Sequence, residues 1–136
     1  MNIILDNGAF KPEFAHKTDV GADLRSPVEA VVPAHGSVVI DTGVHVEIPE
    51  GYVGMLKSKS GLNVKHNLIG EGVIDCGFMG SIRVKLYNLG DTDYQIQRGD
   101  KIIQLVIMPC VYCEFTEVEQ FADSERGTGG FGSTGR

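Results

Sequence analysis

The sequence predicts an all-β domain built as a sandwich, a jelly roll or a barrel. Short runs of alternating apolar and polar residues recur along the chain, and a period of two is typical of a strand with one buried face. Turn-forming groups of Pro, Gly and Asp separate these runs at short intervals. Many short strands between regular turns are typical of these three architectures. Since no sustained 3.6-residue period is present, at most one short helix is expected, after Ser60.

Four segments give the clearest strand signals. Residues 37–48 and 81–89 alternate, with Val44, Val46 and Ile48 on one face of the first segment. Residues 102–107 form a continuous apolar run, which predicts a strand buried on both faces. Residues 113–118 alternate again and predict a final strand. Between these segments, residues 72–78 have the pattern of a β-hairpin with Asp75 near its bend.

Composition limits the possible functions. The 136 residues fit one domain, residues 1–125, followed by a short arm. A net charge of −6 without a run of Lys or Arg argues against nucleic acid as a partner. Because no apolar stretch reaches the roughly 18 residues that cross a bilayer, no membrane partner is expected. The three cysteines are an odd number, which argues against a disulfide framework and favours a cytoplasmic location. Neither the pair Cys110 and Cys113 nor the scattered histidines have the spacing of a zinc site.

The arm, residues 126–136, has the sequence RGTGGFGSTGR. So many glycines cannot form a core and are costly to order, so a flexible segment is expected. Read alone, it is most simply a disordered terminus. It also combines groups that suit a nucleotide, because unshielded backbone N–H groups cradle phosphate, Arg126 offers a bidentate cation and Phe131 offers a ring on which a base can stack.

Five segments, in this order and spacing, resemble the five motifs of the homotrimeric dUTPase family. They are GADLRS from Gly21, KSKSGL from Lys57, GEGVIDCGFMGSI from Gly70, RGDKIIQLVI from Arg98 and RGTGGFGSTG from Arg126. The resemblance covers about residue 19 to the C-terminus. It implies a jelly-roll-like β-barrel and Mg²⁺-dependent hydrolysis of dUTP to dUMP and pyrophosphate. That reaction keeps uracil out of DNA and supplies dUMP for thymidylate synthesis. The resemblance also implies a homotrimer whose active sites are shared between subunits, with the arm of one chain closing over the nucleotide.

The resemblance gives Asp75 the role of the general base, which activates a water for attack on the α-phosphorus. A lone Asp at a bend is otherwise a turn-stabilising residue. By the same resemblance, main-chain groups of Gly72 and Arg83, together with Val73 and Ile74, border the uracil. A strand edge that pairs with uracil leaves polar groups unpaired against cytosine, at about 1–3 kcal/mol each.

Phe78 stands where the family usually has a Tyr that packs on the deoxyribose. The ring is kept and the phenol lost, so we expect discrimination against ribose to survive. Judged only by how often phenylalanine is buried in proteins, Phe78 is equally expected to be a core residue.

Other positions match the family's phosphate and metal contacts. The expected phosphate ligands are Lys59, Ser60, Gly61, Gln104, Arg126, Gly132, Ser133 and Thr134, with Phe131 stacked over the uracil. Ser58 and Lys59 replace the family's usual Pro and Arg, and a lysine supplies a point charge without a bidentate fork. Gln104 is alternatively a structural hydrogen-bonding residue in an apolar strand. Asp23 resembles the residue that holds Mg²⁺ through water, since Mg²⁺ keeps most of its waters and touches few carboxylates.

Two rival functions remain. A dCTP deaminase shares the fold and a similar hairpin, but that family carries a Glu ten residues past the matching Asp, where this chain has Lys85. A cation cannot serve as that base, so deamination, alone or combined with hydrolysis, is disfavoured. The second rival is a binding or signalling module that keeps the nucleotide pocket. The presence of Asp75 together with the arm argues against it.

Overall fold

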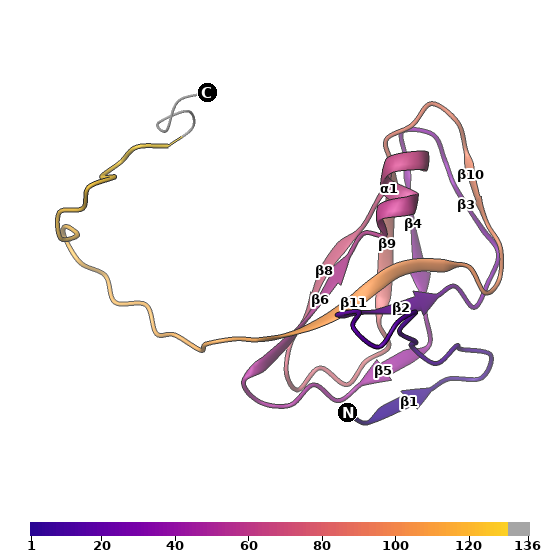
Figure 1. Ribbon diagram of the computed structural model, residues 1–136, viewed down its shortest axis with the longest axis horizontal. Coiled ribbons are helices and arrows are strands. Elements are labelled where there is room, and N and C mark those ends of the chain that lie inside the picture. The colour runs from indigo at the N-terminus through magenta and orange to yellow at the C-terminus, as the bar shows by residue number, and fades with distance from the viewer. Residues whose placement is uncertain (131–136) are drawn as a thin grey trace.

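A computed structural model describes residues 1–130. Within that part of the chain lie eleven strands and one helix, in agreement with the expectation of an all-β domain with at most one short helix (Figure 1). In chain order they are β1 Ile3–Leu5, β2 Gly21–Arg25, β3 Ala30–Val32, β4 Ser37–Asp41, β5 Val44–Val46, β6 Tyr52–Lys57, α1 Ser60–His66, β7 Leu68–Ile69, β8 Glu71–Ile74, β9 Arg83–Asn88, β10 Tyr94–Ile96 and β11 Lys101–Pro109.

Two larger antiparallel sheets enclose the core. One has the strand order β2-β11-β6-β8 and the other the order β4-β9-β7, while β1-β5 and β10-β3 form two smaller pairs. Side chains from all four sheets meet in one apolar cluster that includes Leu24, Leu56, Val84 and Ile103. Within residues 1–130 the strands pair in four antiparallel sheets around this cluster, in agreement with the predicted all-β fold.

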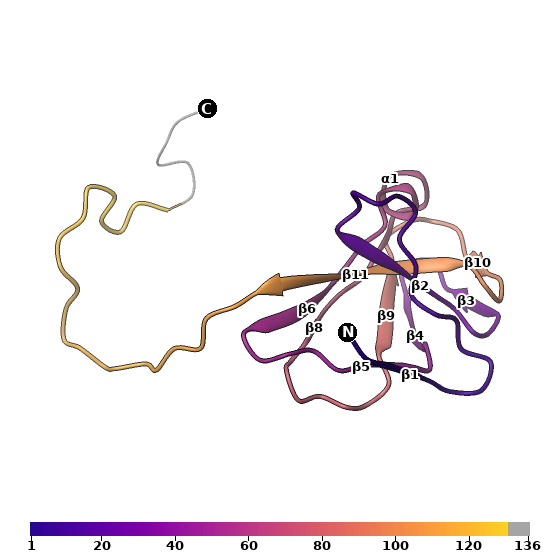
Figure 2. The ribbon, with the colours of Figure 1, turned by 60° about the horizontal axis from the view of Figure 1, so that its bottom comes forward.

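The predicted alternation is confirmed where one strand face meets this cluster. Ile82, Val84 and Leu86 are almost fully buried, whereas Arg83 and Lys85 between them are exposed. Val44, Val46 and Ile48 are buried in the same way. The apolar residues of 102–107 belong to β11, the strand between β2 and β6 (Figure 2). Ile102 and Ile103 are both buried, but the register with β2 shifts at this point. Farther along the strand Leu105 is buried while Val106 and Ile107 are partly exposed, so the predicted burial on both faces is not confirmed.

Two local predictions are wrong. The segment around Asp75 turns as expected, but its two sides do not pair, because β8 is bonded to β6 while β9 is bonded to β4 and β7. Residues 113–118 form no strand in the described part of the chain, and they leave the β domain with their side chains exposed (Figure 1). Alternation indicates only that a segment suits a half-buried surface, and residues 1–130 offer no such surface beside this segment. The helix of the described region is not long and apolar enough to cross a membrane.

Candidate active site

A buried carboxylate with two lysine partners lies beside the first residues of β11. Asp23 on β2 is 2% exposed. Its Oδ1 is 2.5 Å from Lys59 Nζ and its Oδ2 is 2.7 Å from Lys101 Nζ. Gln104 Nε2 approaches the same Oδ1 at 3.5 Å. Three residues expected at the phosphate and metal sites (Asp23, Lys59 and Gln104) are therefore brought together.

A β-bulge explains how Lys101 joins this cluster. The register between β11 and β2 shifts between Lys101 and Ile103, so that Lys101 pairs with Arg25 while Gln104 pairs with Asp23. The extra residue reverses the alternation along the strand. Lys101 and Gln104 consequently reach the same carboxylate, although residues three apart in a regular strand point to opposite faces.

Burial alone raises the pKa of Asp23, because a charged group is less well solvated in the protein. The hydrogen bonds and charges of Lys101 and Lys59 outweigh that effect, and the net pKa of Asp23 lies below its ordinary value. Asp23 is therefore ionised at neutral pH, and the trio of Asp23, Lys59 and Lys101 carries a net charge of about +1. A single net positive charge attracts an anion such as a phosphate.

The neighbouring residues of this segment have distinct places. Lys59 occupies the N-cap position of α1, and Ser60 and Gly61 form its first turn. Lys57 is half-exposed and pairs with Glu71 at 3.3 Å, as expected for a surface position. Ser58 bonds Gly70 twice: its hydroxyl donates to the Gly70 carbonyl at 3.0 Å and accepts from the Gly70 N–H at 2.9 Å. The side chain that replaces the family's usual Pro therefore fastens β6 to the link between β7 and β8.

The residues around Asp23 form one constellation of site residues, and a second constellation surrounds Asp75. A cavity of about 540 Å³ is lined by predicted site residues together with two neighbours. The lining residues are Val73, Ile74, Asp75, Phe78, Gly80, Ser81 and Arg83. Asp75 follows β8 directly, and its carbonyl accepts the Phe78 N–H at 3.2 Å. Gly77 closes this turn with a φ of +84°, a conformation that strains any side chain. Gly72, also expected near the uracil, lies within β8 and is not among the residues that line the cavity.

Phe78 and Arg83 are held by local contacts. A Cβ added at Gly80 would lie 2.5 Å from the Phe78 ring, so the ring rests directly on Gly80 and is 45% exposed rather than in the core. Arg83 Nε is 3.3 Å from Asp41 Oδ2, and the Ser81 hydroxyl donates to Asp41. These bonds lower the pKa of Asp41, the Ser81 hydroxyl most strongly, although burial acts in the opposite direction.

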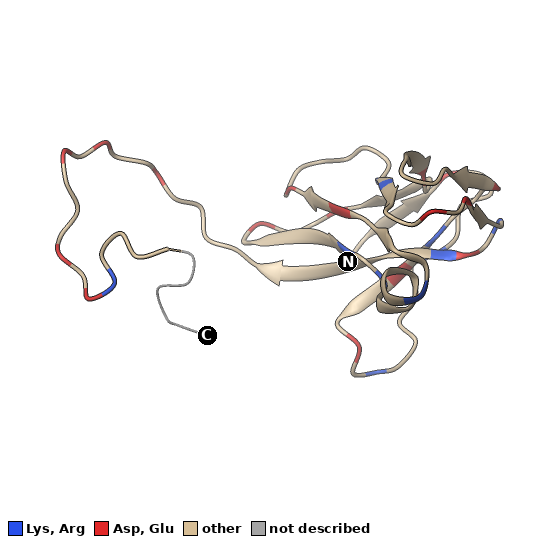
Figure 3. Ribbon diagram, turned by 90° about the horizontal axis from the view of Figure 1, so that it is seen from above, with Lys and Arg blue, Asp and Glu red and all other residues tan. Residues whose placement is uncertain are grey.

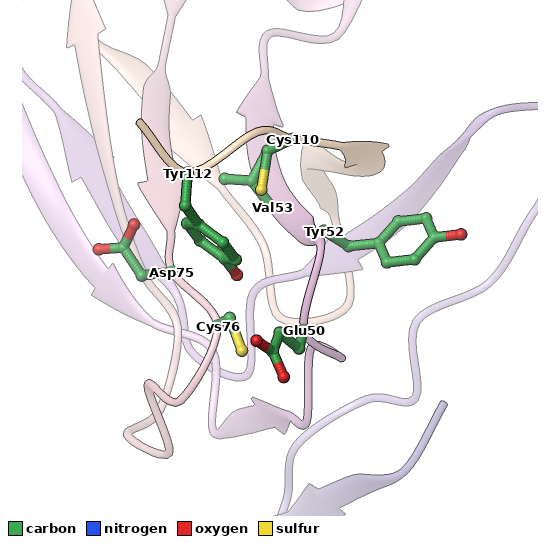
Figure 4. A pocket seen from close by; sticks show the side chains of 7 residues that line it. All are labelled: Glu50, Tyr52, Val53, Asp75, Cys76, Cys110 and Tyr112. Atoms are coloured by element: carbon green, nitrogen blue, oxygen red, sulfur yellow. The ribbon is translucent and has the colours of Figure 1, made fainter. Parts of the chain in front are cut away.

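A neighbouring cavity, also about 540 Å³, lies on the other side of Asp75. Its walls include Glu50, Cys76, Cys110 and Tyr112. Figure 4 shows the Asp75 carboxylate directed away from both thiols, with the Tyr112 ring in the middle of the wall. The Tyr112 hydroxyl accepts the Gly51 N–H at 3.2 Å. All three cysteines of the chain are free thiols. The two cavities meet at Asp75, and the one lined by Phe78 and Arg83 contains the residues expected to contact a nucleoside.

The two constellations lie apart within one chain. Gln104 pairs with Lys57 on β6, whereas Ile74, just before Asp75, pairs with Gly54 on that same strand. These two positions on β6 are three residues apart, so at about 3.3 Å per residue the constellations are separated by about 10 Å or more. Arg126 lies outside both, in the segment leading away from the domain, where its Nε donates to the Gly129 carbonyl at 2.9 Å. The predicted contacts of Phe131, Gly132, Ser133 and Thr134 lie outside the described residues.

Sequence reasoning missed Lys101 and Asp41. Lys101 lies within the segment from Arg98, but its face could not be inferred because the bulge is not visible in the residue pattern. Asp41 ends a strand beside Thr42 and Gly43, where the sequence suggests only a turn. No signal in the sequence joined it to Ser81 and Arg83, which follow 40 and 42 residues later.

Comparisons with known proteins point to one family. The dUTPase family model matches residues 9–135. Deoxyuridine 5′-triphosphate nucleotidohydrolase of Clostridium acetobutylicum is 40% identical over 134 residues, which cover 96% of this chain and 92% of that protein. The enzyme of the same name from Oryza sativa subsp. japonica is 41% identical over 132 residues, covering 96% and 77%.

Solved structures agree with these sequence matches. The dUTPase of Staphylococcus bacteriophage 80alpha with dUPNHPP has a TM-score of 0.88 at 37% identity, covering 99% of this chain and 98% of that one. A mutant dUTPase from phage phi11 of S. aureus, whose structure describes the coordination of a structural Mg(II) ion, has a TM-score of 0.81 at 35% identity, covering 88% and 97%.

Proposed function

This chain belongs to the dUTPase family and is an enzyme that hydrolyses dUTP, and from that premise we propose that Asp75 activates the attacking water. The products of this reaction are dUMP and pyrophosphate. The observation that carries the proposal is that Asp75 shares one cavity with Val73, Ile74, Phe78 and Arg83.

Asp75 suits the role of a general base. Its side chain is exposed at the edge of the cavity and makes no hydrogen bond or ion pair within residues 1–130. Its carboxylate can therefore accept a proton from a water placed in line with the leaving oxygen of the α-phosphate. Asp23 and Asp41, whose oxygens are already bonded, do not offer this capacity.

The walls of the cavity suit a deoxynucleoside. Val73, Ile74 and Arg83 line the space proposed for uracil. Backbone groups of these residues would reject cytosine and thymine better than an apolar pocket does. Phe78 presents its ring from above Gly80, where it excludes a 2′-hydroxyl by its bulk. Lys85 points from the exposed face of β9, with its Nζ 4.9 Å from the Tyr87 ring centroid. The position of the deaminase Glu is therefore occupied by a cation, which favours hydrolysis over deamination.

The phosphates are proposed to bind Lys59, Ser60, Gly61 and Gln104. Mg²⁺ is the cofactor and supplies charge neutralisation of the triphosphate. The expected metal position at Asp23 does not fit this structure, because both carboxylate oxygens are paired with ammonium groups. Residues 1–130 contain no cluster of three or more His, Cys, Asp or Glu side chains that could hold a metal ion. The Mg²⁺ is therefore proposed to arrive on the triphosphate.

We also propose a homotrimer with shared sites, and the separation of the two constellations supports it. A nucleotide held by Asp75 of one subunit can meet Lys59 and Gln104 of a neighbour once the chains assemble. The segment after β11 supports assembly, because Val111, Phe115 and Phe121 are each about nine-tenths exposed and such side chains favour burial against a partner. Acidic residues recur along this segment before Arg126 (red in Figure 3), which supports placing the start of the proposed phosphate-binding arm at Arg126. The free thiols support a reducing, cytoplasmic location.

Pyrophosphate release from dUTP, dTTP, dCTP and UTP, each with Mg²⁺, tests the proposal. Turnover of dUTP is expected to exceed that of each other nucleotide by about 100-fold or more, since a mispaired base leaves buried polar groups unsatisfied. Comparable turnover of dCTP or dTTP would contradict the assignment of the base pocket. Comparable turnover of UTP would contradict only the role of Phe78.

A further inference from the structure

We infer that Lys101 is a positioning residue for phosphate binding, which keeps Asp23 neutralised while Lys59 leaves that carboxylate for the triphosphate. The inference rests on the proposed function, in which Lys59 contacts phosphate. It assigns a role to a residue outside the expected ligands and replaces the expected role of Asp23 as a metal holder.

The geometry provides Asp23 with one partner more than it needs. A single carboxylate is neutralised by one ammonium group, yet Asp23 is bonded to two, one on each oxygen. The side chains of Lys59 and Lys101 are 22% and 34% exposed, whereas that of Asp23 is 3% exposed. Both lysines therefore reach solvent, and the carboxylate between them does not.

Burial makes the second lysine necessary. Removing one partner of a buried pair leaves an uncompensated charge, which is strongly unfavourable. If Lys59 were the only partner of Asp23, its movement to a phosphate would leave that charge behind. With Lys101 in place at 2.7 Å, Asp23 stays paired on Oδ2 when Lys59 departs. Gln104 Nε2, already 3.5 Å from Oδ1, is the donor nearest to the vacated oxygen.

The same arrangement disfavours Mg²⁺ at Asp23. A dication placed beside this carboxylate would lie next to two ammonium groups and be repelled by both. Asp23 instead acts as a counter-ion that holds Lys59 in place until the substrate arrives. Lys101 lies at the start of β11 because of the bulge, and this irregularity is what places a second cation at Asp23.

Lys101→Met, which keeps the length of the side chain and removes its charge, tests the inference. We expect KM for dUTP to rise about tenfold with kcat changed less than about threefold, because the lost interaction concerns binding of the phosphates. Affinity for a non-hydrolysable α,β-imido analogue of dUTP should fall by a similar factor, whereas affinity for dUMP, which lacks the β- and γ-phosphates, should change less than about twofold. Lys101→Arg should restore KM. Lys57→Met, which removes a half-exposed lysine paired with Glu71, is the matched control and should leave KM unchanged.

A double variant separates positioning from structural support. In Asp23→Asn with Lys101→Met, no buried charge needs a partner, so Lys59 is free and KM should return to within about threefold of the wild-type value. If Lys101→Met alone does not fold, the KM of this double variant still tests the inference. An unchanged KM in Lys101→Met, equal weakening of dUMP and the triphosphate analogue, or a double variant still raised tenfold would overturn the inference. Absence of dUTP turnover by the wild-type protein would instead contradict the proposed function.

Discussion

Individual aspartates in this protein differ in what surrounds them, and their surroundings separate structural from chemical roles. Asp23 is buried between two lysines, and Asp41 accepts bonds from Ser81, Gly43 and Arg83. Asp75 is exposed at a cavity edge and makes no side-chain bond within residues 1–130. Of these three aspartates, Asp75 alone offers a carboxylate that can bond a water, which is the property a general base requires.

Asp41 gives a prediction for the dependence of stability on pH. Its pKa is lower in the folded protein than in the unfolded chain, so its ionised form stabilises the fold. This stabilisation is complete above the unfolded pKa of about 3.9 and is lost as the pH falls through the lower, folded pKa. We expect Asp41→Asn to lower Tm by a constant amount above about pH 5 and by progressively less below about pH 4.

Thermal unfolding between pH 2.5 and 7 measures that difference. Asp123→Asn, in the exposed segment after β11, is the control and should match the wild-type protein at each pH. A difference in Tm that stays the same at the lowest pH would show that the ionised carboxylate is not what stabilises this corner.

Strands and their links determine where the site residues lie. The bulge in β11 places Lys101 beside Asp23, and Ser58 fastens the end of β6 to Gly70. That fastening lies beside Lys59, the next residue in the chain. The site residues around Asp23 are therefore positioned by two irregular features, the bulge in β11 and the bonds between Ser58 and Gly70, more than by regular strand pairing.

Ser58→Ala tests the contribution of this link. Both bonds to Gly70 are lost and two partly buried backbone groups are left without that partner. The expected loss in the free energy of unfolding is about 1–3 kcal/mol, measured by urea titration. Ser37→Ala, which removes an exposed hydroxyl from β4, should change stability by less than about 0.5 kcal/mol. Equal stability of Ser58→Ala and the wild-type protein would contradict the proposed role of this serine.

The fold class and most strands could be predicted because Val44, Val46, Ile82 and Val84 alternate against a real buried face. The predictions that failed concern residues whose structure depends on segments far away in the sequence. Residues 113–118 alternate equally well, but they are exposed and pack on no surface within residues 1–130. Of the candidate site, Asp75 and Phe78 were found within one turn, whereas Lys101 was missed because a single inserted residue in β11 reverses which side chains share a face.

Within residues 1–130, one chain holds two separate constellations, and the segment after β11 leads away from the domain (Figure 2). If sites are shared, two inactive variants should complement each other. Asp75→Asn and a truncation before Arg126 are each expected to be inactive, and equal mixing of reassembled subunits should restore about a quarter of wild-type activity when base and arm come from different subunits. Light scattering should give three times the 14.7 kDa mass of the chain. A monomeric mass, or no activity after mixing, would contradict shared sites.

Asp75→Asn tests the central claim most directly. Asparagine keeps the size of the side chain and cannot accept the proton, so the chemical step should be lost while the cavity stays intact. At saturating dUTP with Mg²⁺, we expect kcat to fall by about 100-fold or more, with the affinity for the α,β-imido analogue within about threefold of wild type. A variant that kept most of its kcat would contradict the assignment of Asp75 as the general base.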